Sequence, residues 1–142
     1  MDERDVPRFS LVLVPTDLSE LSNRAIPVAY GLVAPAGCVH LLHVDNGDAA
    51  AAAETAERMR ALIPAVARAR AVRTEVEVVR APSAHQAIAQ TAARLDVDAV
   101  CMATHGRTGL VQAALGSQAQ EVLQRVRQPV VLVPPERARP FG

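Results

Sequence analysis

The chain has 142 residues, half of them hydrophobic, and its 15 basic and 15 acidic residues balance to a formal net charge of zero. This length is typical of one domain with its own core, so we expect a single domain over residues 1–142. The balanced charge argues against a nucleic-acid partner, which normally requires a basic stripe. Aromatic residues are too few for a platform that stacks single-stranded bases; they are Phe9, Tyr30 and Phe141.

All the basic residues are arginines, and the chain contains no lysine. Its absence excludes a phosphate-binding lysine, a Schiff-base lysine and a lysine general base. Cys38 and Cys101 fall in apolar runs far from a C-x-x-C spacing, so we expect buried, inert thiols. The first residues lack the apolar segment of a signal peptide, and no apolar run reaches the ~18 residues of a membrane span. We therefore expect a cytoplasmic protein with no membrane partner.

The first part of the chain predicts a strand, a helix and a second strand. The apolar run Phe9–Val14 is typical of a short buried strand, and the spacing of apolar residues from Leu21 to Leu32 predicts a helix. Pro27 should bend that helix, because proline cannot donate the backbone hydrogen bond of a helix interior. A turn at Pro35–Gly37 then leads to a strand at Val39–Val44.

The middle of the chain predicts a long alanine-rich helix and a strand near a sheet edge. Asp48 is a plausible N-cap, and arginines at Arg68 and Arg70 suit the negative end of the helix dipole. Pro64 should kink or break the helix. The strand Thr74–Val79 alternates polar and apolar residues, which favours an edge position. The helix should bury a stripe of apolar residues, namely Met59, Leu62, Ile63 and Val66.

Two capping boxes mark the remaining helices. Ser83–Gln86 begins a helix that runs through Leu95, and Ser117–Gln120 begins a helix that Pro129 ends. Strands are predicted at Ala99–Ala103 and Val130–Val133. The alternation of apolar strands with amphipathic helices predicts an α/β fold with a parallel sheet and helices on both faces.

Two predicted strand ends carry residues suited to a ligand, because ligands of open parallel sheets bind beyond the carboxyl ends of strands. The first strand ends in Pro15-Thr16-Asp17. The fourth ends at Ala103 and leads through a glycine-bearing segment to Gly116-Ser117, where a helix begins. Glycines let backbone N–H groups approach a phosphate closely, and a helix start favours negative charge. This pattern predicts an anion site.

The exact arrangement resembles the universal stress protein family, whose nucleotide-binding members carry Gly-x-x-Gly, nine residues, then Gly-Ser or Gly-Thr. Gly106 takes the second glycine position and Gly116-Ser117 close the motif, whereas Ala103 replaces the first glycine. Val12–Ser19 is similar to the family's first strand with its aspartate. The segments 41–44 and 129–133 are similar to its second and last strands. The resemblance covers about residues 9–134, which should form the core of the domain.

The resemblance implies a doubly wound, Rossmann-like sheet of the adenine nucleotide alpha hydrolase-like type, with five parallel strands in the order 3-2-1-4-5. Strands one and four would then be neighbours. Asp17 and the backbone of Val44 would hold adenine, between walls formed by Pro15 and Thr16. Met102 and Ala103 would lie against the ribose and phosphates. The phosphates would bind to Gly106, Gly116, Ser117 and the backbone N–H of Gln118. Two residues of the intervening loop, Arg107 and Gly109, are further candidates for nucleotide binding. The ligand would be ATP, ADP or AMP, with Mg²⁺ carried on the phosphates.

The resemblance therefore implies a universal stress protein that binds an adenine nucleotide and signals stress or energy state. It also implies a homodimer through Val130–Val133, an apolar edge that needs covering. An alternative is a dimeric interaction protein that binds no nucleotide, which Ala103 in place of glycine would explain. We see no catalytic set, so we expect no enzyme activity beyond slow, incidental ATP hydrolysis.

Several residues have simpler structural interpretations that the sequence leaves open. Asp17 could be a turn residue that accepts local N–H groups, and Ser117 could be only an N-cap. We expect His43 to be a buried structural histidine and His85 to be solvated. Ala103 would be strained if its φ were positive, and otherwise its methyl group could crowd a ligand.

Overall fold

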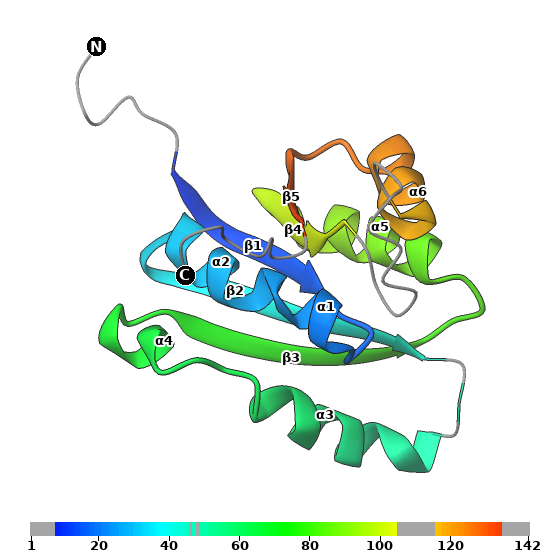
Figure 1. Cartoon of the computed structure of the whole chain (residues 1–142), viewed down its shortest axis with the longest axis horizontal. Coiled ribbons are helices and arrows are strands. Elements are labelled where there is room, and N and C mark those ends of the chain that lie inside the picture. The colour runs from blue at the N-terminus through cyan, green and yellow to red at the C-terminus, as the bar shows by residue number, and fades with distance from the viewer. Residues whose placement is uncertain (1–7, 46, 48, 105–115, 135–142) are drawn as a thin grey trace, which may run out of the picture.

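The computed structural model describes residues 8–45, 47, 49–104 and 116–134. Within these residues, five strands form one parallel sheet in the order β3-β2-β1-β4-β5 (Figure 1). The order confirms the 3-2-1-4-5 arrangement and places β3 at one edge, as its alternating sequence predicted. The strand bounds are β1 Phe9–Pro15, β2 Val33–Asp45, β3 Arg73–Arg80, β4 Ala99–Ala103 and β5 Val130–Val133.

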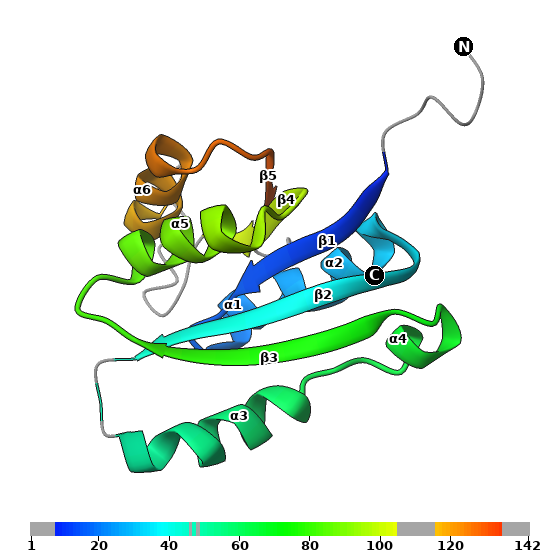
Figure 2. The same ribbon diagram turned by 180° about the vertical axis from the view of Figure 1, so that it is seen from behind.

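Helices cover both faces of this sheet, as Figures 1 and 2 show from opposite sides. One face carries α1 Glu20–Asn23, α2 Ala25–Leu32, α3 Ala52–Arg60 and α4 Val66–Ala69, and the 3-10 helix η2 Ala49–Ala51 precedes α3. The other face carries α5 Ala84–Leu95 and α6 Ser117–Arg125. In the described part of the chain, no helix has the length and apolar character needed to cross a membrane.

Alternate residues of the central strands supply two cores, one on each face. Val12 and Val14 pack with α2, whereas Leu13 packs with α5 and α6. Cys101 lies in the first core and Met102 in the second. Successive side chains of a strand point to opposite faces, so a strand buried on both sides reads as a continuous apolar run. This is why the sequence revealed β1 and β4 so clearly.

Both cysteines are buried and free, as expected. Burial in the core raises the pKa of the Cys101 thiol to about 12. Burial also raises the pKa of Cys38, although the charge of Arg73 opposes this. Both thiols are therefore protonated at neutral pH, and a protonated thiol is a poor nucleophile.

The first helix breaks earlier than expected, at Arg24 between α1 and α2. Pro27 is the third residue of α2. The first N–H groups of a helix have no partner within the helix, so a proline there removes no hydrogen bond. The interruption that Pro27 predicts is present, and it lies three residues before the proline.

The turn expected at Pro35–Gly37 is a bulge within the longer strand β2. Phe9 pairs with Val33, but Leu11 pairs with Cys38, so β2 carries extra residues at this point. Ala36 has a φ of 68°. A Cβ atom on Gly37 would lie 2.8 Å from the carbonyl oxygen of Ser10, which explains the glycine.

The expected long helix is two short ones. Pro64 lies between α3 and α4, which confirms the break predicted there. Because α4 follows a change of direction, it does not extend the buried stripe of α3. Val66 is 39% exposed, so its predicted burial is wrong, whereas Met59 is fully buried. The predicted N-cap Asp48 lies outside the described residues, and Ala51 stands at the N-cap of α3.

Candidate functional site

A cavity of about 200 Å³ opens at the carboxyl ends of β1 and β4. These strands are neighbours, and the chain leaves them toward opposite faces, to α1 from β1 and to α6 from β4. Such a reversal point is where open parallel sheets bind ligands. The lining residues come from strand ends and helix starts; they are Pro15, Thr16, Asp17, Ser22, Leu42, Val44, Ala84, Ile88, Met102, Ala103, Thr104, Gly116, Ser117 and Gln118.

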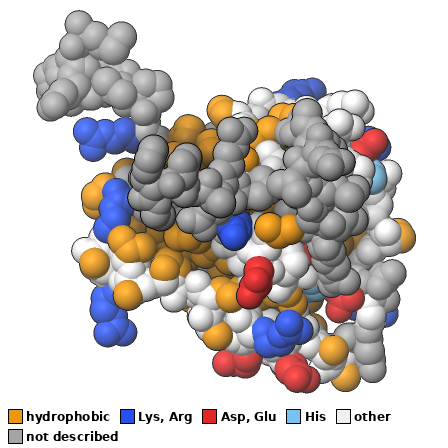
Figure 3. All heavy atoms as spheres, viewed as in Figure 1, with side chains coloured by type: hydrophobic (Ala, Val, Ile, Leu, Met, Phe, Trp, Pro, Cys, Tyr) orange, Lys and Arg blue, Asp and Glu red, His pale blue; other side chains and the backbone are white. Residues whose placement is uncertain are grey.

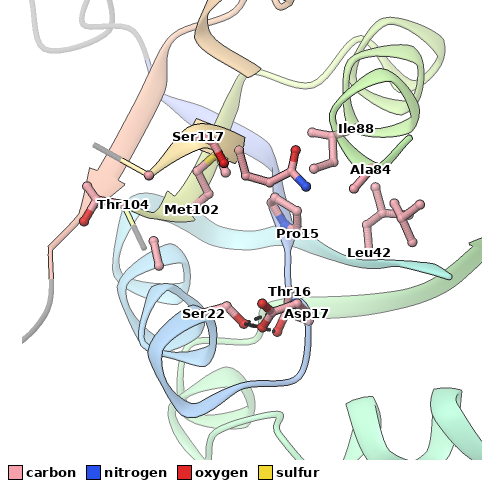
Figure 4. Close-up of a pocket in the computed structure, with 14 residues that line it drawn as sticks. Pro15, Thr16, Asp17, Ser22, Leu42, Ala84, Ile88, Met102, Thr104 and Ser117 are labelled. Atoms are coloured by element: carbon pink, nitrogen blue, oxygen red, sulfur yellow. Dashed lines mark hydrogen bonds between the residues drawn. The ribbon is translucent and has the colours of Figure 1, made fainter. Parts of the chain in front are cut away.

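The cavity has an apolar middle between two polar ends. In Figure 4, Thr16, Asp17 and Ser22 lie together at one end, Ser117 lies toward the other, and Pro15 lies between them. Apolar side chains of Leu42, Val44, Ile88 and Met102 complete the walls. A ligand that fits this arrangement has a flat or apolar body with polar groups at both ends.

Hydrogen bonds hold the first polar end in place. The Asp17 Oδ1 atom accepts from the Ser19 backbone N–H at 2.9 Å and from the Ser22 hydroxyl at 2.7 Å. The Thr16 hydroxyl donates to Asn23 Oδ1 at 2.5 Å and accepts from the Leu18 N–H at 3.0 Å. The local role expected for Asp17 as a turn acceptor is thus present, and the same carboxylate also lines the cavity.

Two long-range hydrogen bonds join this end to β2. The Thr16 N–H donates to the carbonyl oxygen of Leu42 at 2.9 Å. The His43 ring nitrogen Nδ1 donates to the carbonyl oxygen of Thr16, also at 2.9 Å. His43 is 8% exposed, which confirms it as a buried histidine with a structural partner.

The start of α6 forms the second polar end. Gly116 is the N-cap, with no side-chain capping bond, so Ser117 is the first helical residue. The expected capping box at Ser117 is therefore wrong. The Gly116 N–H donates to the Thr104 carbonyl at 2.7 Å and ties the helix start to the end of β4. The first N–H groups of the helix and its dipole favour an anion here.

We expected His85 to be solvated, but it links two helices beside the cavity. Its Nδ1 atom lies 3.1 Å from Oε1 of Gln118, across the starts of α5 and α6. Its Nε2 atom lies 3.8 Å from a carboxylate oxygen of Glu121. Helix packing on the sheet brings these residues together, although 33 positions separate His85 from Gln118.

All the predicted site residues that the structure describes line the one cavity: Pro15, Thr16, Asp17, Val44, Met102, Ala103, Gly116, Ser117 and Gln118. The other predicted residues, Gly106, Arg107 and Gly109, lie outside the described residues. No cluster of three or more metal-ligating side chains occurs among the residues that are described.

Five lining residues were not predicted from the sequence: Ser22, Leu42, Ala84, Ile88 and Thr104. Ile88 was interpreted as part of the buried stripe of its helix, which it also is. Ala84 and Thr104 lie within motifs that the sequence singled out, so their place in these motifs was the available signal. Ser22 offered no such signal, because its role depends on a hydrogen bond to Asp17.

Ala103 is not strained by its backbone. The described non-glycine residues with positive φ are Leu18, Ala36, Ala71 and Asp96. Ala103 instead ends β4 in regular pairing with Val133. Of the possibilities raised by the missing glycine, positive-φ strain is excluded, and the methyl group lies at the cavity wall.

The comparisons agree with this architecture. The model of the universal stress protein family matches residues 9–134. A solved structure of hypothetical protein MJ0577 has a TM-score of 0.77 and 26% identity, covering 93% of this chain and all of that one. No curated protein sequence matches significantly.

Two further similar structures were solved with nucleotides. A universal stress protein in complex with cAMP has a TM-score of 0.66 and 23% identity, covering 92% of this chain and 100% of that one. A universal stress protein family protein from Arabidopsis thaliana with AMP bound has a TM-score of 0.63 and 16% identity, covering 92% of this chain and 93% of that one. At these identities the likeness shows the fold. On the family match over residues 9–134, the chain belongs to the universal stress protein family.

Proposed function

We propose that the cavity binds ATP or a related adenine nucleotide, and that this binding makes the protein a signalling module for stress or energy state. The observation that carries the proposal is the meeting of Pro15-Thr16-Asp17 with Met102-Ala103 and Gly116-Ser117-Gln118 in one cavity. The complexes of similar proteins with cAMP and AMP point to the same ligand class.

The residues present suit the parts of such a nucleotide. The apolar walls of Leu42, Val44 and Met102 match the faces of a purine ring. Asp17 and the backbone at Val44 supply polar partners for its edge. The phosphates would lie at Gly116 and Ser117, where the helix start favours anions. In this proposal the phosphates of the nucleotide would bind Mg²⁺, as they usually do in nucleotide complexes.

In this proposal the cavity binds the nucleotide without hydrolysing it efficiently. In the described part of the cavity the carboxylate is Asp17, and its Oδ1 atom already accepts two hydrogen bonds. The chain has no lysine to neutralise phosphate charge during transfer. We therefore expect hydrolysis well below the ~1 s⁻¹ at the lower end of typical enzymes. A cytoplasmic location also stays a prediction.

Self-association through β5 is a further part of the proposal. In the described residues β5 pairs on one side with β4 and ends the sheet, and its four residues are half-buried. Hydrophobic side chains also gather on the face seen in Figure 3. Within α2, Pro27 and Val28 are exposed. Light scattering should give the mass of a dimer; a monomer at high concentration would contradict this part.

A second candidate function is partner binding without nucleotide on the same fold. The observation in its favour is the Ala103 methyl group at the cavity wall, where nucleotide-binding relatives are expected to have glycine. This candidate predicts an empty cavity that stays empty when nucleotide is added.

The deciding experiment denatures the purified protein and identifies released small molecules by mass spectrometry, followed by calorimetric titration with AMP, ADP and ATP in the presence of Mg²⁺. We expect nucleotide near one per chain, or saturable binding. Ala84→Leu fills the cavity from the start of α5 and should abolish binding. Ala93→Leu changes an exposed residue of the same helix and should not. A flat titration of the wild-type protein would favour the second candidate.

A further inference from the structure

The side chain of Gln118 has a fixed orientation at the cavity wall. Its Oε1 atom lies 3.1 Å from Nδ1 of His85. A carboxamide oxygen can only accept a hydrogen bond, so the His85 Nδ1 atom carries the proton and donates it. Gln118 is thus held by its oxygen, on the side of α6 that faces α5.

The His85 ring also faces an ion pair of α6 on its other side. Its Nε2 atom faces Glu121 Oε2 at 3.8 Å, and Arg125 donates to the same oxygen at 3.1 Å. Glu121 and Arg125 follow Gln118 along α6 at helical spacing, so their side chains share its face. A chain of four side chains, from Arg125 through Glu121 and His85 to Gln118, therefore runs along the seam between α5 and α6.

This orientation decides what Gln118 offers to a ligand. A glutamine presents both acceptors and donors, but here one lone pair of the oxygen accepts from His85 and the oxygen is turned toward α5, while both N–H donors of the amide remain. Beside them stand the Ser117 hydroxyl and the first N–H groups of α6. Every one of these groups can donate a hydrogen bond at the positive end of a helix dipole, which suits an oxyanion rather than the amino group of a purine.

We infer that Gln118, positioned by His85, makes the cavity select nucleotides that carry a phosphate over the corresponding nucleosides. This rests on the proposed function and adds a side-chain determinant to it. The family resemblance assigned only the backbone N–H of Gln118 to phosphate binding. His85 is the positioning residue and does not itself line the cavity.

The test compares the affinities of AMP and adenosine by calorimetry in the full-length protein. Gln118→Met keeps the length of the side chain but removes its donors. It should weaken the binding of AMP about tenfold, which is the effect of losing one hydrogen bond to a charged group, and should change the binding of adenosine little. His85→Phe should weaken AMP in the same selective way. His85→Asn places an amide N–H near the position of Nδ1 and should restore most of the affinity.

Gln124→Met is the matched control, because Gln124 is exposed on α6 and is not among the lining residues. It should bind AMP and adenosine as the wild-type protein does. ¹⁵N NMR of the wild-type protein should also show the proton on His85 Nδ1. In His85→Phe the Gln118 amide protons should shift toward the values of a free side chain.

Each outcome separates the inference from the proposed function. If the wild-type protein binds AMP and the Gln118 and His85 variants bind it equally well, the inference is overturned and the proposed function stands. If AMP and adenosine weaken together, Gln118 shapes the wall without selecting the phosphate, and the inference is again overturned. If the wild-type protein binds no adenine nucleotide, the proposed function is overturned, and the inference that rests on it is overturned as well.

Discussion

The His43 ring nitrogen Nδ1 lies 2.9 Å from the carbonyl oxygen of Thr16, so the end of β2 is hydrogen-bonded to the residue that follows β1. A carbonyl can only accept, which places the proton on Nδ1. Both residues are buried, Thr16 at 5% and His43 at 8% exposure. This bond fixes the chain at the polar end of the cavity that contains Asp17.

Removing the His43 donor should destabilise the fold. His43→Phe leaves the buried Thr16 carbonyl without this partner, and an unsatisfied buried polar group costs about 1–3 kcal/mol. Urea denaturation should show a loss of that size in the free energy of unfolding. His43→Asn retains a side-chain N–H and should lose less. Equal losses in the two variants would show that packing, and not the hydrogen bond, is responsible.

Ser22 should matter for nucleotide binding more than its neighbour Ser19 does. Ser22→Ala removes the hydroxyl that donates to Asp17 Oδ1, whereas Ser19→Ala removes the N-cap of α1. Each should cost about 1 kcal/mol of stability. Only Ser22→Ala loosens the cavity carboxylate, so AMP affinity should fall about fivefold, the factor for 1 kcal/mol. Equal affinities in the two variants would contradict this role.

Gly37 and Gly31 should respond oppositely to alanine. A Cβ atom on Gly37 would clash with Val33 Cγ1 and lie 2.9 Å from the carbonyl oxygen of Ala34, so overpacking should cost about 1–3 kcal/mol. Gly31 has nothing within 4 Å of such an atom and lies in α2, so Gly31→Ala should stabilise by about 0.5–1 kcal/mol. Thermal unfolding of both variants checks the two signs.

Glu77 should make the stability of the fold depend on pH in the acid range. Its carboxylate binds His40 at 2.7 Å and Arg94 at 2.7 and 2.8 Å. Burial tends to raise the pKa of Glu77, but the hydrogen bonds and charges of His40 and Arg94 outweigh it, so the pKa is lowered. Because this pKa is lower in the folded state, ionised Glu77 stabilises the fold at pH values above the unfolded pKa of about 4.5. That stabilisation is lost as the pH falls through the folded pKa.

Glu77→Gln should therefore cost about 1 kcal/mol at pH 7, and the difference from wild type should shrink as pH falls below about 4.5. Urea denaturation across this range measures it. Glu54→Gln, at an exposed position in α3, serves as the control and should have a small effect. A difference for Glu77→Gln that does not change with pH would contradict the assignment.

Ala103→Gly should destabilise the protein, although it restores the glycine of the family motif. Because Ala103 has no positive φ, glycine relieves no strain and adds backbone freedom to the unfolded chain. The expected loss is about 0.5–1 kcal/mol by chemical denaturation. A gain in stability would mean that the alanine is strained after all.

The sequence predicted the elements well where local physical chemistry decides them. The apolar runs of β1 and β4 could be located because a strand buried on both faces needs continuous apolar residues. Ser83 was correctly predicted as a cap, since its hydroxyl accepts from the Gln86 N–H. The break at Pro64 follows from the missing N–H of proline. The strand order came from the family resemblance, because periodicity reports burial and not neighbours.

The tertiary structure alone decided the details of the site. The exposure of Val66, the first-turn position of Pro27 and the N-cap at Gly116 depend on where each helix begins once it packs on the sheet. The hydrogen bonds from Ser22 to Asp17 and from His85 to Gln118 require that packing. A sequence pattern shows which face of an element is buried; which side chains then meet is set by how the helices lie across the ends of β1 and β4.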